Sequence, residues 1–286
     1  MSLTRGVRTL LVLGRASNLP TVWSNCLAGW ILGGGGTRQR LLALCGGATL
    51  LYLGGMFLND AFDAQFDQQH RPERPIPSGA IRAGPVWKWG FVFLGLGWLV
   101  LGWLGNPSLV LATVLVLSIL IYDAVHKIFE FSPVLMAGCR FLLVILAAST
   151  AADGVAGLSI WSALVLAAYI VGLSYLARRE SVRATPEYWP CALLAAPIVL
   201  ALIVNQNGFQ RRGFLLSALL ALWVLGSLRQ AFWAAQPNVG RSVSALLAGI
   251  VLVDLLAVGG GTPTVGVMFA SLFILALLFQ RFIPAT

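Results

Sequence analysis

The sequence predicts an all-α protein that crosses a membrane many times. Apolar residues make up 58% of the 286-residue chain, and charged residues make up only 10%. Apolar runs of about 20 residues, the length that a helix needs to cross a bilayer, recur from one end of the chain to the other. No long linker or low-complexity segment divides them. We therefore expect a single transmembrane domain over residues 1–286, built from nine or ten helices.

The apolar runs follow one another in a regular order. They lie at residues 18–34, 41–62, 86–104, 107–124, 132–151, 158–177, 189–205, 213–232, 242–259 and 264–282. The first run follows a basic segment and has no small-x-small cleavage site, so we expect an uncleaved helix. Gly105-Asn106-Pro107 forms a short connection between the third and fourth runs. The segment 259–263 is either a tight turn between the last two runs or a break in one longer helix. The number of transmembrane helices is therefore ten or nine.

The distribution of charge orients these helices. With the N-terminus in the cytoplasm, most of the 19 Lys and Arg residues fall on cytoplasmic segments, as the positive-inside rule requires. The net charge of +9 is therefore a signature of topology and not of nucleic-acid binding. Most of the 10 Asp and Glu residues fall on the same side. Acids and bases gathered at one end of a helix bundle predict a central polar cavity that opens to the cytoplasm.

The second run ends in the most informative stretch, NDAFDAQFDQQHRPERPIPSG, at residues 59–79. Continued as a helix, it places four oxygen-bearing side chains within an arc of roughly 100°: Asn59, Asp60, Asp63 and Asp67. Crowded carboxylates repel one another unless a cation lies among them, and oxygen ligands suit Mg²⁺. Arg71 and Arg74 follow, and guanidinium groups bind phosphate oxygens in a bidentate way. The alternative is a solvated acidic helix end before a Pro-rich turn.

The fourth run ends in a second polar stretch, IYDAVHK, at residues 121–127. Lys127 is a natural point charge for a diphosphate, although the side chain would also fit a snorkelling position. Tyr122 and Asp123 are candidates for substrate contact and proton transfer, or else anchors at the membrane interface. We expect His126 to face the interface and to take no part in catalysis.

Arg140 lies inside the fifth run, in the segment MAGCR. An unpaired guanidinium in the middle of a span costs at least about 2.5–3.5 kcal/mol, so a partner or an anionic ligand should offset the cost. Pairing with a carboxylate such as Asp123 and direct contact with a ligand are both open. Asp254, in the ninth run, is placed similarly and has no assigned role.

These stretches together resemble the UbiA superfamily of intramembrane prenyltransferases. Residues 59–79 reproduce that family's first Asp-rich motif, NDxxDxxxD followed by RPxRPIPSG, without a gap. Tyr122 and Lys127 are similar to its Tyr-x4-Lys element, and residues 15–25, RASNLPTVWSN, are similar to its opening segment. The resemblance covers essentially the whole chain.

The resemblance implies a fold, a cofactor and roles for individual residues. In the family, a bundle of transmembrane helices surrounds a central cavity, and the first Asp-rich motif holds Mg²⁺ on the diphosphate of an isoprenoid donor. By this resemblance Asp63 and Asp67 are catalytic metal ligands, Lys127 contacts the diphosphate and Asn25 reaches the pocket. The implied partners are an isoprenyl diphosphate, an acceptor of unknown identity and the lipid bilayer, with no nucleic acid.

The place of the family's second Asp-rich motif differs in this chain. Residues 172–183 read GLSYLARRESVR, in which Glu180 is the only acid and Arg178 and Arg179 have entered. With YDAVHK and LMAGCR, this resembles the EboC-like branch, a UbiA-type subgroup associated with bacterial secondary metabolism. We expect one Mg²⁺ in place of two, with Arg178 or Arg179 supplying fixed positive charge to the diphosphate. The alternative is that Glu180 alone helps to hold a second ion.

The function that the resemblance implies is Mg²⁺-dependent transfer of a prenyl group to a small polar or aromatic acceptor. The implied setting is the bacterial inner membrane, and the distribution of charge predicts that the active site faces the cytoplasm. Asp123 is the best-placed base for the acceptor, or else it orients Arg140. Two other functions remain open. A UbiA-type terpene cyclase would act on the diphosphate alone, and a non-catalytic carrier would use the cavity for transit.

Overall fold

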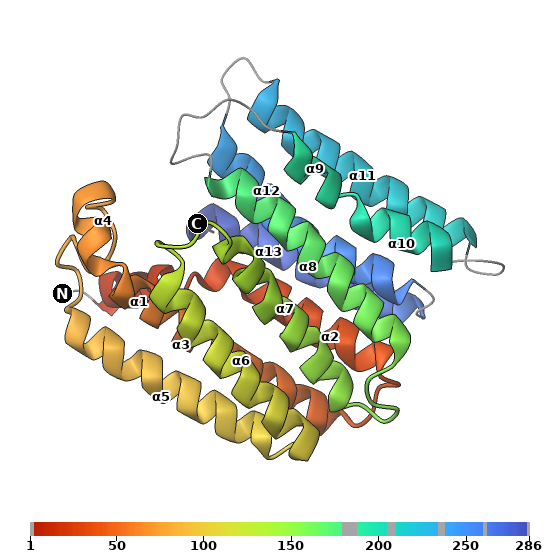
Figure 1. Cartoon of the computed structure of the whole chain (residues 1–286), viewed down its shortest axis with the longest axis horizontal. Helices are drawn as coiled ribbons and strands as arrows, with labels where there is room; N and C mark the ends of the chain where they lie inside the picture. Colours follow the sequence, from red (N-terminus) through yellow and green to blue (C-terminus); the bar gives the residue numbers. More distant parts are fainter. Residues whose placement is uncertain (1–2, 179–187, 205–209, 234–237, 260–261, 285–286) are drawn as a thin grey trace.

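The computed structural model describes residues 3–178, 188–204, 210–233, 238–259 and 262–284, and every regular element in these ranges is a helix (Figure 1). In chain order they are α1 (Leu3–Leu13), η1 (Ala16–Asn18), α2 (Leu19–Leu32), α3 (Arg38–Phe62), α4 (Ala64–His70), α5 (Ala83–Gly102), α6 (Asn106–Val125), α7 (Ser132–Ser149), α8 (Gly157–Arg178), α9 (Trp189–Leu193), α10 (Ala196–Val204), α11 (Gln210–Phe232), α12 (Val239–Val258) and α13 (Pro263–Phe282). The predicted all-α class is confirmed.

Within these ranges, eight helices are long and apolar enough to cross a membrane: α3, α5, α6, α7, α8, α11, α12 and α13. Each overlaps one of the predicted runs. The other two predicted runs are shorter. The first is α2, which has 14 residues and is followed by four glycines, Gly33 to Gly36. The seventh is divided into α9 and α10, because Pro197 lacks the N–H that would continue the helix from α9.

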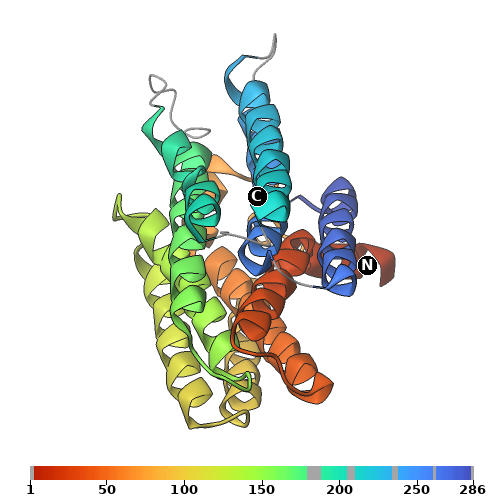
Figure 2. The same cartoon turned by 90° about the vertical axis from the view of Figure 1, so that its right-hand side faces the viewer.

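The short helix α2 lies in the middle of the bundle, where it contacts α3, α7, α12 and α13 (Figures 1 and 2). Most of its side chains are buried. Because longer neighbours enclose it, α2 brings polar residues from the first part of the chain into contact with residues of α7 and α12 inside the bundle.

Helices α3 and α5 pack along each other through glycines. A Cβ added to Gly54 would lie 2.9 Å from the carbonyl oxygen of Gly90, and a Cβ added to Gly97 would lie 2.9 Å from that of Gly47. Small residues of this kind let the backbones of membrane helices approach closely. The contact fixes the end of α3, which carries the Asp-rich stretch, against the start of α5.

The two ends of the bundle differ in polarity. At one end the connections are tight, and the Ala152 and Asp153 amides donate to the carbonyls of Gly35 and Gly33, each at 2.8 Å. At the other end lie α4 and the polar stretches that follow α3 and α6 (Figure 1). The predicted site residues are therefore gathered at one end.

The helix that carries the Asp-rich stretch is interrupted at Asp63. α3 ends at Phe62 and α4 begins at Ala64, although the Asp63 amide still donates to Asn59 at 2.9 Å and the Asp67 amide to Asp63 at 2.8 Å. The prediction of one uninterrupted helix is therefore wrong at this residue, where a turn lies between two helices. The carboxylate of Asp63 is held by side chains that follow α6.

Candidate active site

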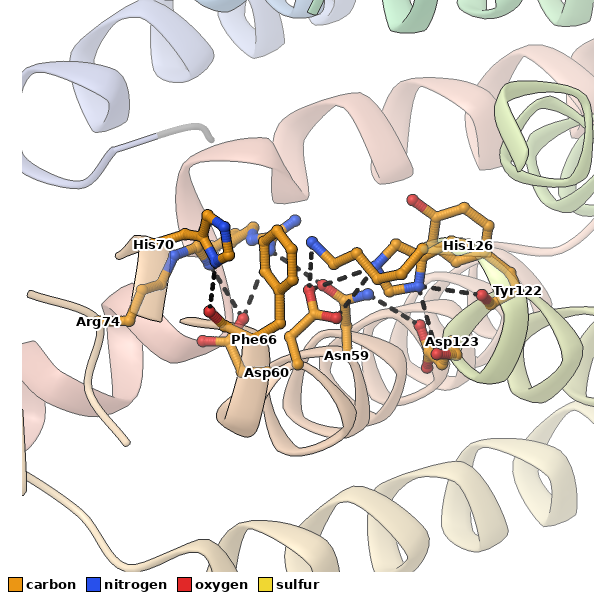
Figure 3. Close-up of polar contacts among 11 residues, drawn as sticks. Asn59, Asp60, Phe66, His70, Arg74, Tyr122, Asp123 and His126 are labelled. Carbon is orange, nitrogen blue, oxygen red and sulfur yellow. Dashed lines mark hydrogen bonds and ion pairs between the residues drawn. The ribbon is translucent and has the colours of Figure 1, made fainter. Parts of the chain in front are cut away.

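The first acid of the cluster, Asp60, is held between two arginines. Its Oδ1 lies 3.0 Å from Arg74 Nη1 and 3.4 Å from Arg15 Nη2. The same nitrogen of Arg15 donates to Asn59 Oδ1 at 3.0 Å. Arg15 stands between α1 and η1 in a left-handed backbone conformation (φ 41°), and Tyr52 donates to its carbonyl at 3.3 Å. Arg15 thereby joins the N-terminal segment to the end of α3, where Figure 3 shows Asp60 beside Arg74.

The second acid, Asp63, contacts the polar end of α6. Its carboxylate lies 3.2 Å from Lys127 Nζ and 3.2 Å from His126 Nε2. Lys127 also lies 4.2 Å from the centre of the Phe66 ring, a distance typical of a cation–π contact. The Asp63 carboxylate thus joins the segment after α3 to the segment after α6, which is more than 60 positions away in the sequence.

His126 belongs to the cavity wall and not to the outer surface. Its ring stacks on Tyr122 with 5.0 Å between centroids, and the residue lines the cavity. The expectation that His126 faces the membrane interface is wrong. The reason is that α6 ends at Val125, so that the side chain at the helix end turns toward Asp63.

Two buried carboxylates keep an oxygen that has no partner within the described part of the chain. Asp123 is 3% exposed; its Oδ1 accepts from Asn59 Nδ2 at 3.2 Å, and its Oδ2 has no hydrogen bond. Asp67 is 2% exposed, and its Oδ1 has none either. Because an unsatisfied buried oxygen is costly, these two atoms are where a ligand or an ion would bind most favourably.

The environment separates the acidities of Asp63 and Asp67. Burial acts to raise the pKa of the Asp63 carboxyl, but the hydrogen bond and charge of His126 and the charge of Lys127 together hold that pKa below its ordinary value. Burial raises the pKa of the Asp67 carboxyl, and the charge of Arg74 offsets only part of this effect. As the pH falls, Asp67 therefore takes up a proton before Asp63 does.

A cavity of about 810 Å³ adjoins the cluster. One part of its wall is polar and includes Arg15, Arg71, Arg74, Tyr122, Asp123, His126, Lys127 and Glu130. The rest is largely apolar and includes Leu51, Leu115, Ile119, Leu143, Leu173, Val243 and Leu247. The space has a charged end and a hydrocarbon interior, and its size lies in the range of small-molecule sites, roughly 300–1,000 Å³.

Arg140 is held by a buried network deeper in the bundle. Its Nη1 donates to Asn25 Oδ1 at 2.7 Å, and its Nη2 donates to Thr21 Oγ1 at 3.2 Å. The amide of Asn25 donates in turn to Asp254 Oδ2 at 2.7 Å, which also accepts from Ser24 at 2.5 Å. The suggested pairing of Arg140 with a carboxylate such as Asp123 is not found. Its link to an acid runs through Asn25 to Asp254, which had no role from the sequence.

The oxygen donors are chemically suited to Mg²⁺, although they are not gathered into a ready-made site. In the described parts of the chain, no three His, Cys, Asp or Glu residues lie close enough to hold a metal ion by themselves. Mg²⁺ commonly binds through one or two carboxylates and completes its shell with waters and substrate phosphates. Asp67, with its free Oδ1, and the neighbouring Asp63 fit that mode.

The structure brings most of the predicted site residues together. Members of the charged cluster or of its cavity wall are Asn59, Asp60, Asp63, Asp67, Arg71, Arg74, Tyr122, Asp123 and Lys127. Asn25 and Arg140 form the deeper network. Arg178 is the last residue of α8, and the predictions for its side chain, for Arg179 and for Glu180 lie outside the described residues.

Sequence reasoning missed the central position of Arg15. The residue was quoted within the opening segment, but no role was given to its side chain. The only available signal was its place just before the first apolar run, a place that positive-inside topology explains equally well.

Comparison with known proteins places the chain among membrane prenyltransferases. A sequence profile described as the UbiA prenyltransferase family matches residues 18–284. The digeranylgeranylglyceryl phosphate synthase of Methanothrix thermoacetophila is 33% identical over 118 residues, which are 41% of this chain and 44% of the relative. That of Methanoregula boonei is 32% identical over 92 residues, 32% of this chain and 33% of the relative. The matched segments span less than half the length of these curated relatives.

Solved structures agree in fold. An apo UbiA homologue from Aeropyrum pernix K1 superposes with a TM-score of 0.66 at 14% identity, covering 86% of this chain and 97% of the other. A UbiA homologue from Archaeoglobus fulgidus bound to GPP and Mg²⁺ gives 0.55 at 15% identity, covering 96% and 97%. At such low identity the likeness concerns the fold, and the profile match over nearly the whole length carries the assignment. The chain belongs to the UbiA prenyltransferase family.

Proposed function

We propose that this protein transfers a prenyl group from an isoprenyl diphosphate to a second substrate within the membrane, with Mg²⁺ as cofactor. The observation that carries the proposal is a cluster of acids and bases at one wall of a cavity whose interior is largely apolar. An allylic diphosphate has the complementary form, a charged head on a hydrocarbon tail. The Archaeoglobus fulgidus homologues, which hold GPP or DMAPP with Mg²⁺, support this donor class.

The charges favour a diphosphate that arrives together with a divalent cation. The cluster holds four carboxylates and four cations: Asp60, Asp63, Asp67 and Asp123 with Arg15, Arg71, Arg74 and Lys127. A diphosphate alone would bring more negative charge to the carboxylates, and a metal alone would bring more positive charge to the cations. With both bound, the carboxylates would hold the metal, and the cations that they now pair with would donate to phosphate oxygens.

Individual residues take the following roles. Asn59, Asp63 and Asp67 hold Mg²⁺, with Asp60 beside them. The ion supplies Lewis acidity at the leaving diphosphate. Lys127, now paired with Asp63 at 3.2 Å, donates to the diphosphate and places positive charge where negative charge develops. Arg71 and Arg74 add to that charge.

The reaction breaks the C1–O bond of the donor, and the electron pair leaves with the diphosphate. C1 then bonds to a nucleophilic atom of the second substrate, whose proton passes to a base. Asp123 is the candidate base, because Asn59 fixes its Oδ1 at 3.2 Å while its Oδ2 has no partner among the described residues. Tyr122 lines the cavity next to it. The apolar wall keeps water from the allylic cation.

The altered second motif supports a single Mg²⁺. Arg178 and Arg179 stand in the sequence where relatives place carboxylates, and Glu180 is the one acid that remains there. Fixed positive charge would bind the diphosphate and repel a second divalent ion. The same sequence feature supports membership of the EboC-like branch and, with it, an acceptor from bacterial secondary metabolism.

The proposed setting is the bacterial inner membrane, with residues 1–286 as a single domain and the charged cluster on the cytoplasmic side. The support is the excess of Lys and Arg on the segments at the cluster's end of the bundle. The donor then enters from the bilayer by its tail, while its diphosphate stays at the aqueous face.

The test uses the purified protein in detergent with geranyl diphosphate. We expect donor binding that requires Mg²⁺ and is abolished by EDTA. Lipid extracts from cells with the active protein should contain a prenyl mass added to a polar metabolite, and cells with Asp63→Asn should lack it. A hydrocarbon formed from the donor alone would identify a terpene cyclase. Absence of Mg²⁺-dependent donor binding would contradict the proposal and favour a carrier.

A further inference from the structure

Arg140 is a charged residue of the cavity to which the donor chemistry gives no task. Its guanidinium Cζ lies 5.9 Å from the centre of the Tyr52 ring. Tyr52 and Asn59 are both on α3, and their separation of seven positions corresponds to about 10 Å along the helix. Arg140 is therefore about two turns deeper in the bundle than the acid cluster. It lines the same cavity and keeps part of its surface accessible there.

The hydrogen-bond partners of Arg140 are neutral. They are the Asn25 amide oxygen at 2.7 Å and the Thr21 hydroxyl at 3.2 Å. Among the residues that the structure describes, no carboxylate lies within ion-pair distance of Arg140. A guanidinium offers five N–H donors in a planar fork, so these two partners leave part of the fork for a ligand.

The network behind Arg140 fixes the direction of the guanidinium. Asn25 donates its amide N–H to Asp254 at 2.7 Å, which leaves its oxygen facing Arg140. Ser24 holds the other side of the interaction by donating to Asp254 at 2.5 Å. Helices α2, α7 and α12 thus hold the Arg140 guanidinium in place. Its positive charge is not neutralised by direct contact with the Asp254 carboxylate, because Asn25 lies between them.

Neither part of the donor suits this group. The hydrocarbon tail has no atom that accepts a hydrogen bond, and a fixed positive charge near the cavity's interior repels an allylic cation. The diphosphate is held two turns away, at the acid cluster. A negatively charged group on another molecule would satisfy the free donors of Arg140 and also remove the repulsion.

We propose that Arg140 is the binding site for an anionic group, a carboxylate or a phosphate, on the second substrate, and that this site is separate from the diphosphate site. The inference rests on the proposed function. It narrows the second substrate to a molecule whose anionic end lies near Tyr52 and whose nucleophilic atom points back toward Asp123 and the donor carbon. Occupation of Arg140 also favours ionisation of the donor, so that the diphosphate is cleaved when the second substrate is present.

The test is calorimetric titration of the purified full-length protein with benzoate, phenyl phosphate and benzamide, with and without saturating geranyl diphosphate and Mg²⁺. We expect benzoate or phenyl phosphate to bind, and benzamide, which has the same shape as benzoate without the charge, to bind at least tenfold more weakly. Which anion binds more tightly distinguishes a carboxylate from a phosphate. Geranyl diphosphate should not displace the bound anion.

Two variants locate the site. Arg140→Gln can still donate to Asn25 and lacks the charge, and it should weaken anion binding by about 10- to 100-fold while Mg²⁺-dependent binding of geranyl diphosphate stays unchanged. Arg140→Lys keeps the charge without the planar fork and should bind the anion with intermediate affinity. If Arg140→Gln does not fold, Arg140→Lys and the benzoate–benzamide pair still decide the matter.

The outcomes separate this inference from the proposed function. Equal binding of benzoate and benzamide, unchanged anion affinity in both variants, or displacement of the anion by geranyl diphosphate would overturn the separate anion site while donor binding stands. Loss of geranyl diphosphate binding in Arg140→Gln would assign Arg140 to the donor and overturn it as well. Absence of Mg²⁺-dependent donor binding in the unaltered protein would instead count against the proposed function.

Discussion

At the scale of single residues, the cluster is an arrangement of exchangeable ion pairs. Asp60 is shared by Arg15 and Arg74, and Asp63 is shared by His126 and Lys127. Buried charges are costly unless they are paired, and the protein pairs Asp60 and Asp63 without a ligand. Each carboxylate in these ion pairs could bind a metal instead, and each cation could bind a phosphate. A ligand that brings both a metal and a phosphate would therefore leave neither member of an ion pair without an opposite charge.

Asp67→Asn should abolish Mg²⁺-dependent binding of geranyl diphosphate and leave the fold intact. The substitution keeps the shape of the side chain and removes the charge next to its free oxygen, and Mg²⁺ prefers carboxylate oxygen. Titration calorimetry with and without Mg²⁺ measures the loss. The matched control is Asp153→Asn, an exposed acid in the connection at the opposite end of the bundle. Equal binding by both variants would remove Asp67 from the metal site.

Lys127→Gln should lower the rate of donor cleavage by about 10²–10³-fold, the usual cost of losing one donor to a developing anion. The ammonium lies 3.2 Å from Asp63 and lines the cavity. Release of diphosphate from geranyl diphosphate is the measurement, in the presence of the lipid extract that supplies the second substrate. Lys88→Gln, which alters an exposed lysine on α5, is the control. A rate in Lys127→Gln equal to that of the control would exclude a role in leaving-group stabilisation.

At the scale of elements, close helix packing positions the site. The Asp-rich stretch follows α3 directly, so its place depends on how α3 is held by α5 through the glycine contacts. The central helix α2 depends in the same way on Gly29, where a Cβ would lie 2.7 Å from Ala147 Cβ on α7. Contacts of this kind tolerate no added atoms, because the nearest neighbours are backbone and short side chains.

Gly97→Ala should destabilise the folded protein by about 1–3 kcal/mol, the usual cost of overpacking. The new methyl group would lie 2.8 Å from Leu51 Cδ2 and 2.9 Å from the Gly47 carbonyl, so α3 and α5 must separate. The control is Gly95→Ala on the same helix, where nothing lies within 4 Å of the new atom. Thermal unfolding in detergent gives the comparison. An equal midpoint for the two variants would show that the contact contributes little.

At the scale of the whole molecule, the charged cluster of the cavity lies at one end of the bundle. Most charged residues that line the cavity come from the end of α6, from the segments after α3 and α6 and from the chain before η1, and Arg140 comes from α7. At the opposite end, the connection between α2 and α3 is tight, and its Gly33 and Gly35 carbonyls accept from the amides of Asp153 and Ala152. This asymmetry lets a charged head stay near water while a hydrocarbon tail occupies the bundle. It also makes the orientation in the membrane a requirement for function.

Labelling of single cysteines should place the two ends on opposite sides of the membrane. In a cysteine-free background, Ser78→Cys lies in the exposed connection before α5, and Asp153→Cys lies in the exposed connection before α8. In inverted vesicles, an impermeant maleimide should react with the first and not with the second; in intact spheroplasts the order should reverse. Reaction of both from one side would overturn the proposed topology.

The sequence by itself determined the all-α membrane class, the positions of the long helices and the Asp-rich stretch. These features depend on consecutive residues: the length of an apolar run, a Pro or Gly that ends it, and the spacing of acids beside it. The sequence predicted longer helices than the structure has at three places. These are α2, the break between α9 and α10, and the break at Asp63, and each depends on a local interruption of the helix.

The tertiary structure alone decided which side chains meet. Arg15 reaches Asn59 across 44 positions, Arg140 reaches Asn25 across 115, and Asn25 reaches Asp254 across 229. No local pattern carries such contacts, because they depend on the order in which α2, α3, α7 and α12 pack. His126 was misplaced for the same reason: its place just after α6 is compatible with the interface, and its contact with the Asp63 carboxylate, from the turn between α3 and α4, depends on how the helices pack.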